Sequence, residues 1–109
     1  GEKRLRLERA RAEQMIEAQV RNALQQIQTA RQRVTAADAS ANAAKAKLDS
    51  ETRLFESGES TNFLVLTRQN DYADALRRAV VARLDFNKSV SLLEQALGTT
   101  LASYNIVLP

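Results

Sequence analysis

Carboxylate pairs are the features of this sequence best suited to chemistry. Asp71 and Asp74 stand three residues apart, which places both on one face of a helix, and Glu56 and Glu59 flank Gly58. Such pairs bind cations or transfer protons when they converge in a desolvated pocket. A short helical chain offers little concavity for such a pocket. We therefore expect these carboxylates to be solvated.

The chain has neither cysteine nor histidine among its 109 residues. This composition excludes disulfide bonds, thiolate or imidazole metal sites, cysteine nucleophiles and every Ser-His or Cys-His relay. Gly58 stands outside any GxxxxGK pattern, so it forms no phosphate-binding loop. We expect no catalytic residue, no bound metal and no cofactor, which means that the chain is not an enzyme.

Basic residues are the other charged feature with a functional interpretation. Asp74 precedes Arg77 by three residues and Arg78 by four, a spacing that favours ion pairing along one helix. The formal net charge is only +3, and the basic residues at the N-terminus alternate with acidic ones. Mixed signs on a helix usually form a solvated face. We expect no nucleic-acid partner.

The composition indicates that helices carry all of these residues. Apolar residues make up 44% of the chain, with three glycines and a single proline at the last position. The abundant Ala, Leu, Gln, Arg and Glu are strong helix formers, and a β-sandwich would need many more Gly and Pro turns. The predicted fold class is all-α. The sequence has no run of eighteen apolar residues that would span a bilayer.

A heptad pattern predicts a first helix over about residues 3–57. One core line is Val20, Ile27, Val34, Ala41, Leu48 and Phe55. The other core line is Ile16, Ala23, Ala30, Ala37 and Ala44. A strict seven-residue repeat implies a left-handed supercoil against a partner helix. The alanines predict that the two helix backbones approach closely.

Residues 56–62, ESGESTN, are the only interior interruption of this helical period. Gly58 can adopt the left-handed conformation that closes a helix, and Ser60 or Thr61 can cap the next one. We expect the second helix over about residues 62–97. Gly98 is expected to end it, which leaves residues 98–109 as an irregular tail.

The second helix carries two apolar lines. Its core stripe is expected at Val65, Tyr72, Leu76, Ala79, Phe86, Val90, Leu93 and Leu97. The second line is Leu66, Ala73, Val80 and Leu84. Together the two helices predict one long antiparallel, coiled-coil-like hairpin that spans residues 1–109 as a single domain. One partner helix cannot bury both lines, so we expect self-association or a place in a larger bundle.

Three segments carry motifs of a known family: residues 53–66 (RLFESGESTNFLVL), residues 84–87 (LDFN) and residues 93–98 (LEQALG). They resemble the outer-membrane efflux protein family, the TolC family. Residues 53–66, RLFESGESTNFLVL, resemble the family's tip pattern of an aromatic, a glycine, small polar residues and an aliphatic stretch. Residues 84–87, LDFN, are similar to its Asp-Tyr-Asn ending of an Ala-rich stretch, and residues 93–98, LEQALG, to its terminal Leu-Glu-x-Ala-Leu-Gly. The resemblance covers residues 53–98, and its ending suggests the second of the family's two repeats.

The resemblance implies a fold, a location and partners. Family members are trimers with an outer-membrane β-barrel and a periplasmic α-barrel of long helical hairpins, so this chain would be one periplasmic hairpin of a Gram-negative channel for efflux or type I secretion. The hairpin tip would dock a periplasmic adaptor protein, with an inner-membrane transporter as an indirect partner. The docking residues carried over are Ser57, Gly58, Glu59, Ser60, Thr61, Phe63 and Leu64.

The sequence departs from the family at the tip. Members frequently have acidic residues where this chain has Leu64 and Thr67, so a charged gate is not expected here. Phe55 occupies an aromatic position that contributes to closing the pore in some members. The alternative for Phe55 is a hydrophobic contact that stabilises the last helical turn.

Two other functions fit the same sequence. Periplasmic adaptors also have Ala-rich antiparallel hairpins with a Gly-Ser tip, although Gly-, Pro- and Val-rich β segments follow theirs. A plain coiled-coil assembly or nucleic-acid-binding module is the remaining alternative. The tip pattern and the ending at Leu97 and Gly98 favour the channel.

Overall fold

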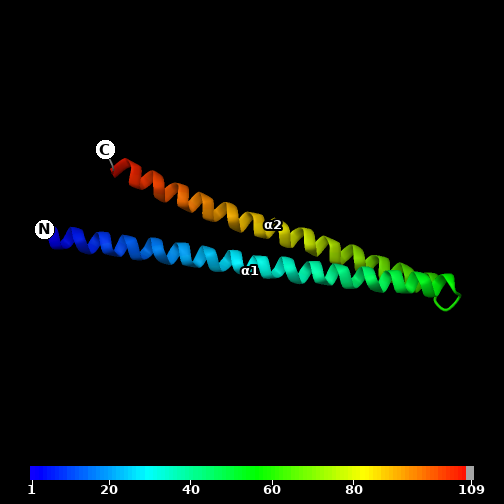
Figure 1. Cartoon of the computed structure of the whole chain (residues 1–109). Helices are drawn as coiled ribbons and strands as arrows, with labels where there is room; N and C mark the ends of the chain where they lie inside the picture. The colour runs from blue at the N-terminus through cyan, green and yellow to red at the C-terminus, as the bar shows by residue number, and fades with distance from the viewer. Residues whose placement is uncertain (108–109) are drawn as a thin grey trace. The chain divides into compact units, whose positions relative to one another are not determined.

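The computed structural model describes residues 1–107 of the chain, and their side chains as far as residue 102. It contains two helices, α1 (Glu2–Glu56) and α2 (Asn62–Val107), joined by a short turn. Figure 1 traces α1 from blue to green and α2 from green to red. The described residues include no strand. The predicted all-α hairpin and the position of its turn are confirmed.

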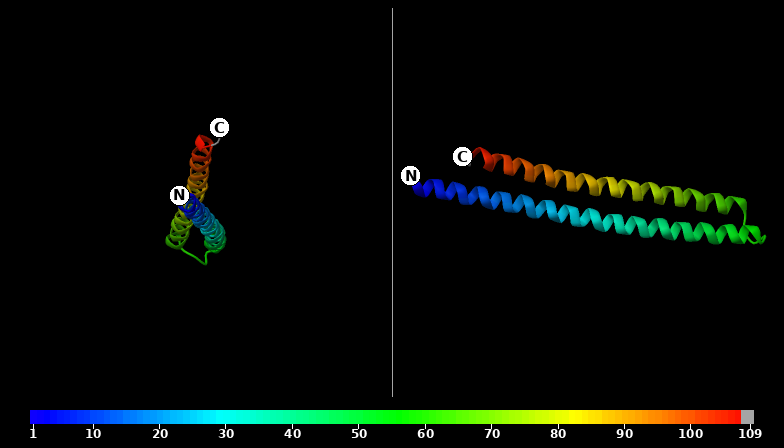
Figure 2. Two further views of the ribbon diagram at one scale, coloured as in Figure 1. Left: turned by 90° about the vertical axis from the view of Figure 1, so that its left-hand side faces the viewer. Right: turned by 45° about the horizontal axis from the view of Figure 1, so that its top comes forward.

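Contacts divide the chain into two compact units. One comprises Ala30–Phe86 and contains the turn, and the other comprises Gly1–Thr29 together with the segment from Asn87 onward. In the first unit the two helices run antiparallel and side by side up to the turn, as Figure 2 shows. We call this unit the tip unit and the other the outer unit.

The core of the tip unit consists almost entirely of alanine. Its buried apolar residues are Ala30, Ala41, Val65, Ala75, Ala79 and Ala82. Small side chains allow the two helix backbones to approach closely, as the sequence predicted for α1. The predicted α1 lines are confirmed from Ile16 to Leu48, because each of their residues is buried or half-buried. Phe55, at the end of one line, is 45% exposed.

The predicted stripe of α2 is correct in part. Val65 and Ala79 are buried, and Tyr72 and Phe86 are half-buried. Leu76 was expected in the core and is 43% exposed, whereas its neighbour Ala75 is only 4% exposed. The reason is the register of the helix: the buried and half-buried positions 68, 75, 82 and 89 repeat every seven residues, and Leu76 is turned by about 100° from Ala75.

The second apolar line of α2 faces away from α1 and remains exposed. Leu66, Val80 and Leu84 keep 49%, 56% and 60% of their surface. Adjacent residues of a helix are turned by about 100°, so this line lies on a different face from Val65 and Ala79. The prediction that α1 cannot bury both apolar lines of α2 is confirmed.

The outer unit has a thinner core. Its half-buried positions are Ile16, Val20, Ala23, Ile27, Ser89, Val90, Leu93 and Thr100, and none of its described side chains is fully buried. Leu97 was expected in the stripe but is 41% exposed. Two core positions in the outer unit are held by the polar Ser89 and Thr100, which leaves less apolar area buried there.

Helix α2 does not end at Gly98, so the expected irregular tail is wrong for residues 98–107. Gly98 lies inside this helix, and Gly58 is the only described residue with positive φ. The hydroxyls of Thr99 and Thr100 donate to the carbonyl oxygens of Gln95 and Ala96, at 3.0 and 2.9 Å. Glycine weakens a helix by about 1 kcal/mol relative to alanine but does not break it. Residues 108 and 109 lie outside the described part.

Candidate functional site at the hairpin tip

Helix α1 ends in a Schellman motif built on Gly58. The backbone N–H of Gly58 donates to the carbonyl oxygen of Phe55 (3.0 Å), and that of Glu59 donates to the carbonyl oxygen of Leu54 (2.8 Å). These are the two bonds of the motif, and they require a left-handed residue between them. Gly58 supplies it with φ of 83°. The predicted left-handed helix end at Gly58 is confirmed.

Helix α2 begins with a cap from Thr61. The backbone N–H of Leu64 donates to Thr61 Oγ1 at 3.2 Å, and that of Val65 donates to the Thr61 carbonyl oxygen at 3.2 Å. A side-chain oxygen in this position satisfies one of the free N–H groups at the helix start. Of the two candidates, Thr61 rather than Ser60 is therefore the cap.

Ser60 instead ties the turn to α1. Its hydroxyl donates to Glu51 Oε2 at 2.7 Å, and Arg68 Nε donates to Glu51 Oε1 at 3.5 Å. The Glu51 side chain is only 11% exposed and Arg68 is 37% exposed. One carboxylate thus connects α1, the turn and the first turns of α2. We call Glu51, Ser60 and Arg68 the tip clasp.

Sequence reasoning missed the tip clasp, although a signal for it was present. Glu51 stands seven residues after Ala44, at the next position of the core line that holds Ala30 and Ala37. A charged residue at such a core position needs partners, because burying an unpaired carboxylate is costly. The clasp supplies these partners.

The tip presents apolar side chains directly after the turn. Phe63 is 74% exposed and Leu64 is 40% exposed. On the other side of the turn, Leu54 and Phe55 are 42% and 45% exposed. The polar residues Ser57, Gly58, Glu59 and Thr61 are exposed, and Ser60 is half-buried. All the predicted docking residues therefore lie at one end of the tip unit, with mixed apolar and polar surface.

Leu64 and Thr67 are uncharged, so they do not form a charged gate. The hydroxyl of Thr67 makes a hydrogen bond within α2. Thr67 Oγ1 donates to the carbonyl oxygen of Phe63 at 2.9 Å. The side chain is therefore satisfied locally. The exposed aromatic ring of Phe55 is the remaining candidate for a constriction, and that role stays a prediction.

The carboxylates singled out for chemistry, Glu56, Glu59, Asp71 and Asp74, are all exposed. Asp74 lies 2.8 Å from Arg77 Nη2, which confirms the predicted helical pair, and Asp71 lies 3.9 Å from Arg68 Nη1. Arg78 Nε donates to the backbone carbonyl of Asp74 at 3.4 Å. Within residues 1–107 no three acidic side chains gather into a group suited to a metal ion. The absence of catalysis and of metal binding stays a prediction.

Neither described helix is long and apolar enough to cross a membrane. Comparisons with family models, with curated protein sequences and with solved structures find no match to this chain. The resemblance to the TolC family therefore depends on residues 53–98 of the sequence itself.

Proposed function

We propose that the chain is a periplasmic helical hairpin of an outer-membrane channel protein for efflux or type I secretion, and that its tip docks a periplasmic adaptor. The observation that carries this proposal is the exposure of Phe63, which keeps 74% of its surface beside a turn held by backbone bonds. The chain acts passively in this role: it lines a conduit and holds a partner, while energy for transport comes from elsewhere.

The geometry of the tip suits a docking surface. Phe63 and Leu64 supply apolar area, and the small residues Ser57 and Gly58 beside them are exposed. The Schellman motif, the Thr61 cap and the tip clasp hold the turn in one conformation. A preorganised surface loses less conformational entropy when it binds, which favours affinity.

The sequence supports the same assignment from a second direction. Residues 53–66 are similar to the TolC-family tip, and residues 93–98 are similar to the end of its second repeat. That likeness implies a site on the periplasmic side of a Gram-negative outer membrane. It also implies a trimeric parent protein with an inner-membrane transporter as an indirect partner. A trimer repeats a small tip contact several times and gains affinity through multivalency.

The two alternatives make different demands on the parent protein. An adaptor would flank this hairpin with Gly-, Pro- and Val-rich β segments, and its tip would then dock a channel. A coiled-coil assembly or nucleic-acid-binding module would leave the tip without a partner, and salt-dependent DNA binding would support the latter. The parent reading frame of a channel would contain a signal peptide, two hairpin repeats and amphipathic strands between them.

Transport by the full-length parent protein tests the tip directly. Phe63→Ser and Leu64→Asp remove apolar docking surface without touching the core. The matched controls are Val81→Ser and Leu92→Asp, because Val81 and Leu92 are 50% and 51% exposed on α2 beyond the tip. We expect drug efflux or secretion to fall with the tip variants and to persist with the controls, at equal expression and trimer assembly.

A photo-crosslinking residue at position 63 should also capture an adaptor in cells, whereas one at position 77 should not. Arg77 is exposed and paired with Asp74, away from the turn. If both tip variants leave transport intact while Arg77→Ala abolishes it, the side of the helix is the working surface and the proposal is wrong.

A further inference from the structure

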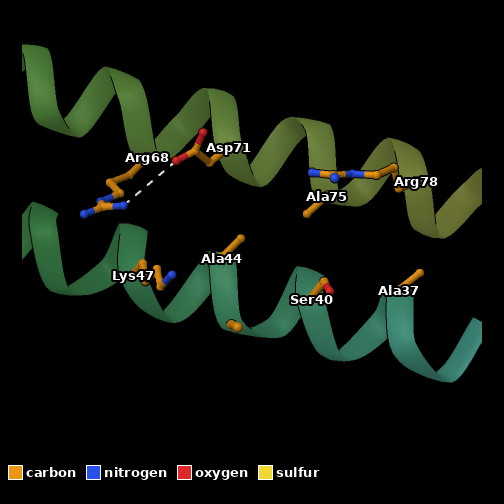
Figure 3. A pocket seen from close by; sticks show the side chains of 9 residues that line it. Ala37, Ser40, Ala44, Lys47, Arg68, Asp71, Ala75 and Arg78 are labelled. Atoms are coloured by element: carbon orange, nitrogen blue, oxygen red, sulfur yellow. Dashed lines mark ion pairs between the residues drawn. The ribbon is translucent and has the colours of Figure 1, made fainter.

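One side of the tip unit is hollowed into a groove between α1 and α2. Its volume is about 430 Å³. Ala37, Ala44 and Ala75 line it, and we call them its alanine floor; Figure 3 shows their side chains between the two helices. Lys47 from α1 and Arg78 from α2 lie at its rims. Small alanine side chains from both helices line this groove.

A second hollow extends this groove toward the turn. It has a volume of about 330 Å³, shares Lys47 and Arg68 with the first, and reaches Leu54. Along α1 the two hollows span residues 37–54. At 1.5 Å per residue that is roughly 25 Å, the length of a helix of about 17 residues. The dimensions suit a third helix lying along the hairpin.

The basic side chains that line the groove differ in whether a carboxylate lies beside them. Arg68 is held by Glu51 at 3.5 Å and by Asp71 at 3.9 Å. By contrast, none of the ion pairs found within residues 1–107 involves Lys47 or Arg78. The guanidinium of Arg78 donates to a backbone carbonyl instead. Within this described part of the chain, two cations therefore face the groove without a carboxylate partner, one from each helix.

We propose that this groove docks an amphipathic acidic helix of a partner protein. Small or apolar residues of that helix would lie on the alanine floor, and its carboxylates would meet Lys47 and Arg78. Charge complementarity of this kind selects partners and orients them. The surface includes none of residues 57–64, so this inference is independent of the proposed tip function.

A synthetic helix provides the test. The probe is an acetylated and amidated alanine-rich peptide of about 17 residues, with glutamates on one face and a neutral fluorophore. Its binding to the whole chain is followed by fluorescence anisotropy at about 50 mM salt, where screening is weak. A second peptide has glutamine in place of every glutamate. We expect saturable binding of the acidic peptide only.

Matched variants locate the binding. Lys47→Gln with Arg78→Gln removes both unpaired cations of the groove. Lys45→Gln with Arg77→Gln removes the same charge from neighbouring positions outside it. Two ion pairs at a partly exposed rim predict about fivefold weaker binding for the first variant and no change for the second. Ser40→Leu fills the groove without changing charge and should also weaken binding, with helicity checked by circular dichroism.

Any of five results would overturn the proposal. The acidic peptide fails to bind below about 1 mM, the glutamine peptide binds equally well, both double variants weaken binding alike, or Ser40→Leu leaves binding unchanged. A change in the sedimentation of the peptide-free chain on Lys47→Gln with Arg78→Gln would indicate a second copy of the chain as the occupant, which also contradicts the proposal.

Discussion

The Ser60 hydroxyl donates a 2.7 Å hydrogen bond to the Glu51 carboxylate, and so fastens the turn to the preceding helix. The carboxylate stands in the core line of α1 and is 11% exposed. Arg68 meets the same carboxylate from α2. The geometry of the tip therefore depends on a charged residue in a position where the rest of that line holds alanine or isoleucine.

Removing this carboxylate should loosen the turn. Glu51→Ala restores the alanine pattern of the core line but leaves Ser60 and Arg68 without their shared acceptor. Hydrogen bonds to charged groups contribute about 1.5–3 kcal/mol, and partial exposure of Arg68 lowers the expected loss of unfolding free energy to about 1 kcal/mol. Hydrogen exchange should show faster exchange of amides 58–65, with residues 30–45 unchanged.

Asp49→Ala is the matched control for the tip clasp. Asp49 is an exposed acidic residue two positions earlier on α1. The substitution Asp49→Ala changes the net charge by the same amount as Glu51→Ala. It should leave hydrogen exchange of the turn amides unaffected. Equal protection of the turn in both variants would mean that the backbone bonds alone hold the tip.

The two core lines of α1 could be predicted from the sequence because their residues recur strictly every seventh position. Residues such as Ala30 and Ala41 were placed correctly since a seven-residue repeat fixes one face of a helix. The seam of α2 was harder to predict. Leu76 is the more apolar candidate, yet the seven-residue spacing of α2 places Ala75 in the core. That core line also holds the polar Arg68 and Ser89, so hydrophobicity alone does not reveal it.

The tip was predictable in outline but not in its hydrogen bonds. The need for positive φ at Gly58 follows from the glycine itself. The sequence does not show whether Ser60 or Thr61 is the cap, because either hydroxyl can accept the hydrogen bond. The Ser60 hydroxyl donates to Glu51, which lies nine residues earlier in the chain. Only the folded hairpin brings these two side chains together.

Gly58 should tolerate asparagine better than alanine. A Cβ atom added at Gly58 would meet no atom within 4 Å, so the cost of Gly58→Ala comes from the φ of 83°. Left-handed backbone costs about 1–2 kcal/mol for most residues and less for asparagine. Urea unfolding should therefore show a lower free energy for Gly58→Ala than for Gly58→Asn. Equal stability of the two variants would contradict the strained turn.

Replacing Gly98 by alanine should raise the free energy of unfolding, whereas replacing Gly58 by alanine should lower it. This glycine is helical, and a methyl group added to it would stand in open space with no atom within 4 Å. Gly98→Ala should raise helix stability by about 0.5–1 kcal/mol. Circular dichroism should show increased helical signal and a higher melting temperature. No gain in either measurement would indicate that the backbone is not helical at Gly98.

The Asp38–Arg83 pair should add a small, salt-dependent coupling between the helices. Arg83 Nη2 lies 2.6 Å from Asp38 Oδ2, with side chains 60% and 39% exposed. Exposed pairs contribute about 0.2–1 kcal/mol and weaken as salt screens them. A double-mutant cycle with Asp38→Asn and Arg83→Gln should give coupling in that range at low salt. Coupling that does not fall in about 1 M salt would contradict a solvated pair.

Self-association should use the exposed line of α2. Leu66, Val80 and Leu84 form an apolar face that α1 does not cover, and contiguous exposed apolar surface favours association. Sedimentation velocity of the isolated chain should show oligomers that grow with concentration. Substituting all three residues by lysine should shift the chain to monomer, because each charge would have to be buried or would keep the copies apart.

A matched triple-lysine variant distinguishes this face from a general effect of charge. Leu5, Leu7 and Met15 on α1 are also exposed, at 66%, 60% and 64%. Replacing them by lysine adds the same three charges away from the exposed line of α2. We expect this variant to keep associating as the unsubstituted chain does. Equal dissociation of both variants, or a stable monomer of the unsubstituted chain at high concentration, would show that the α2 face does not drive assembly.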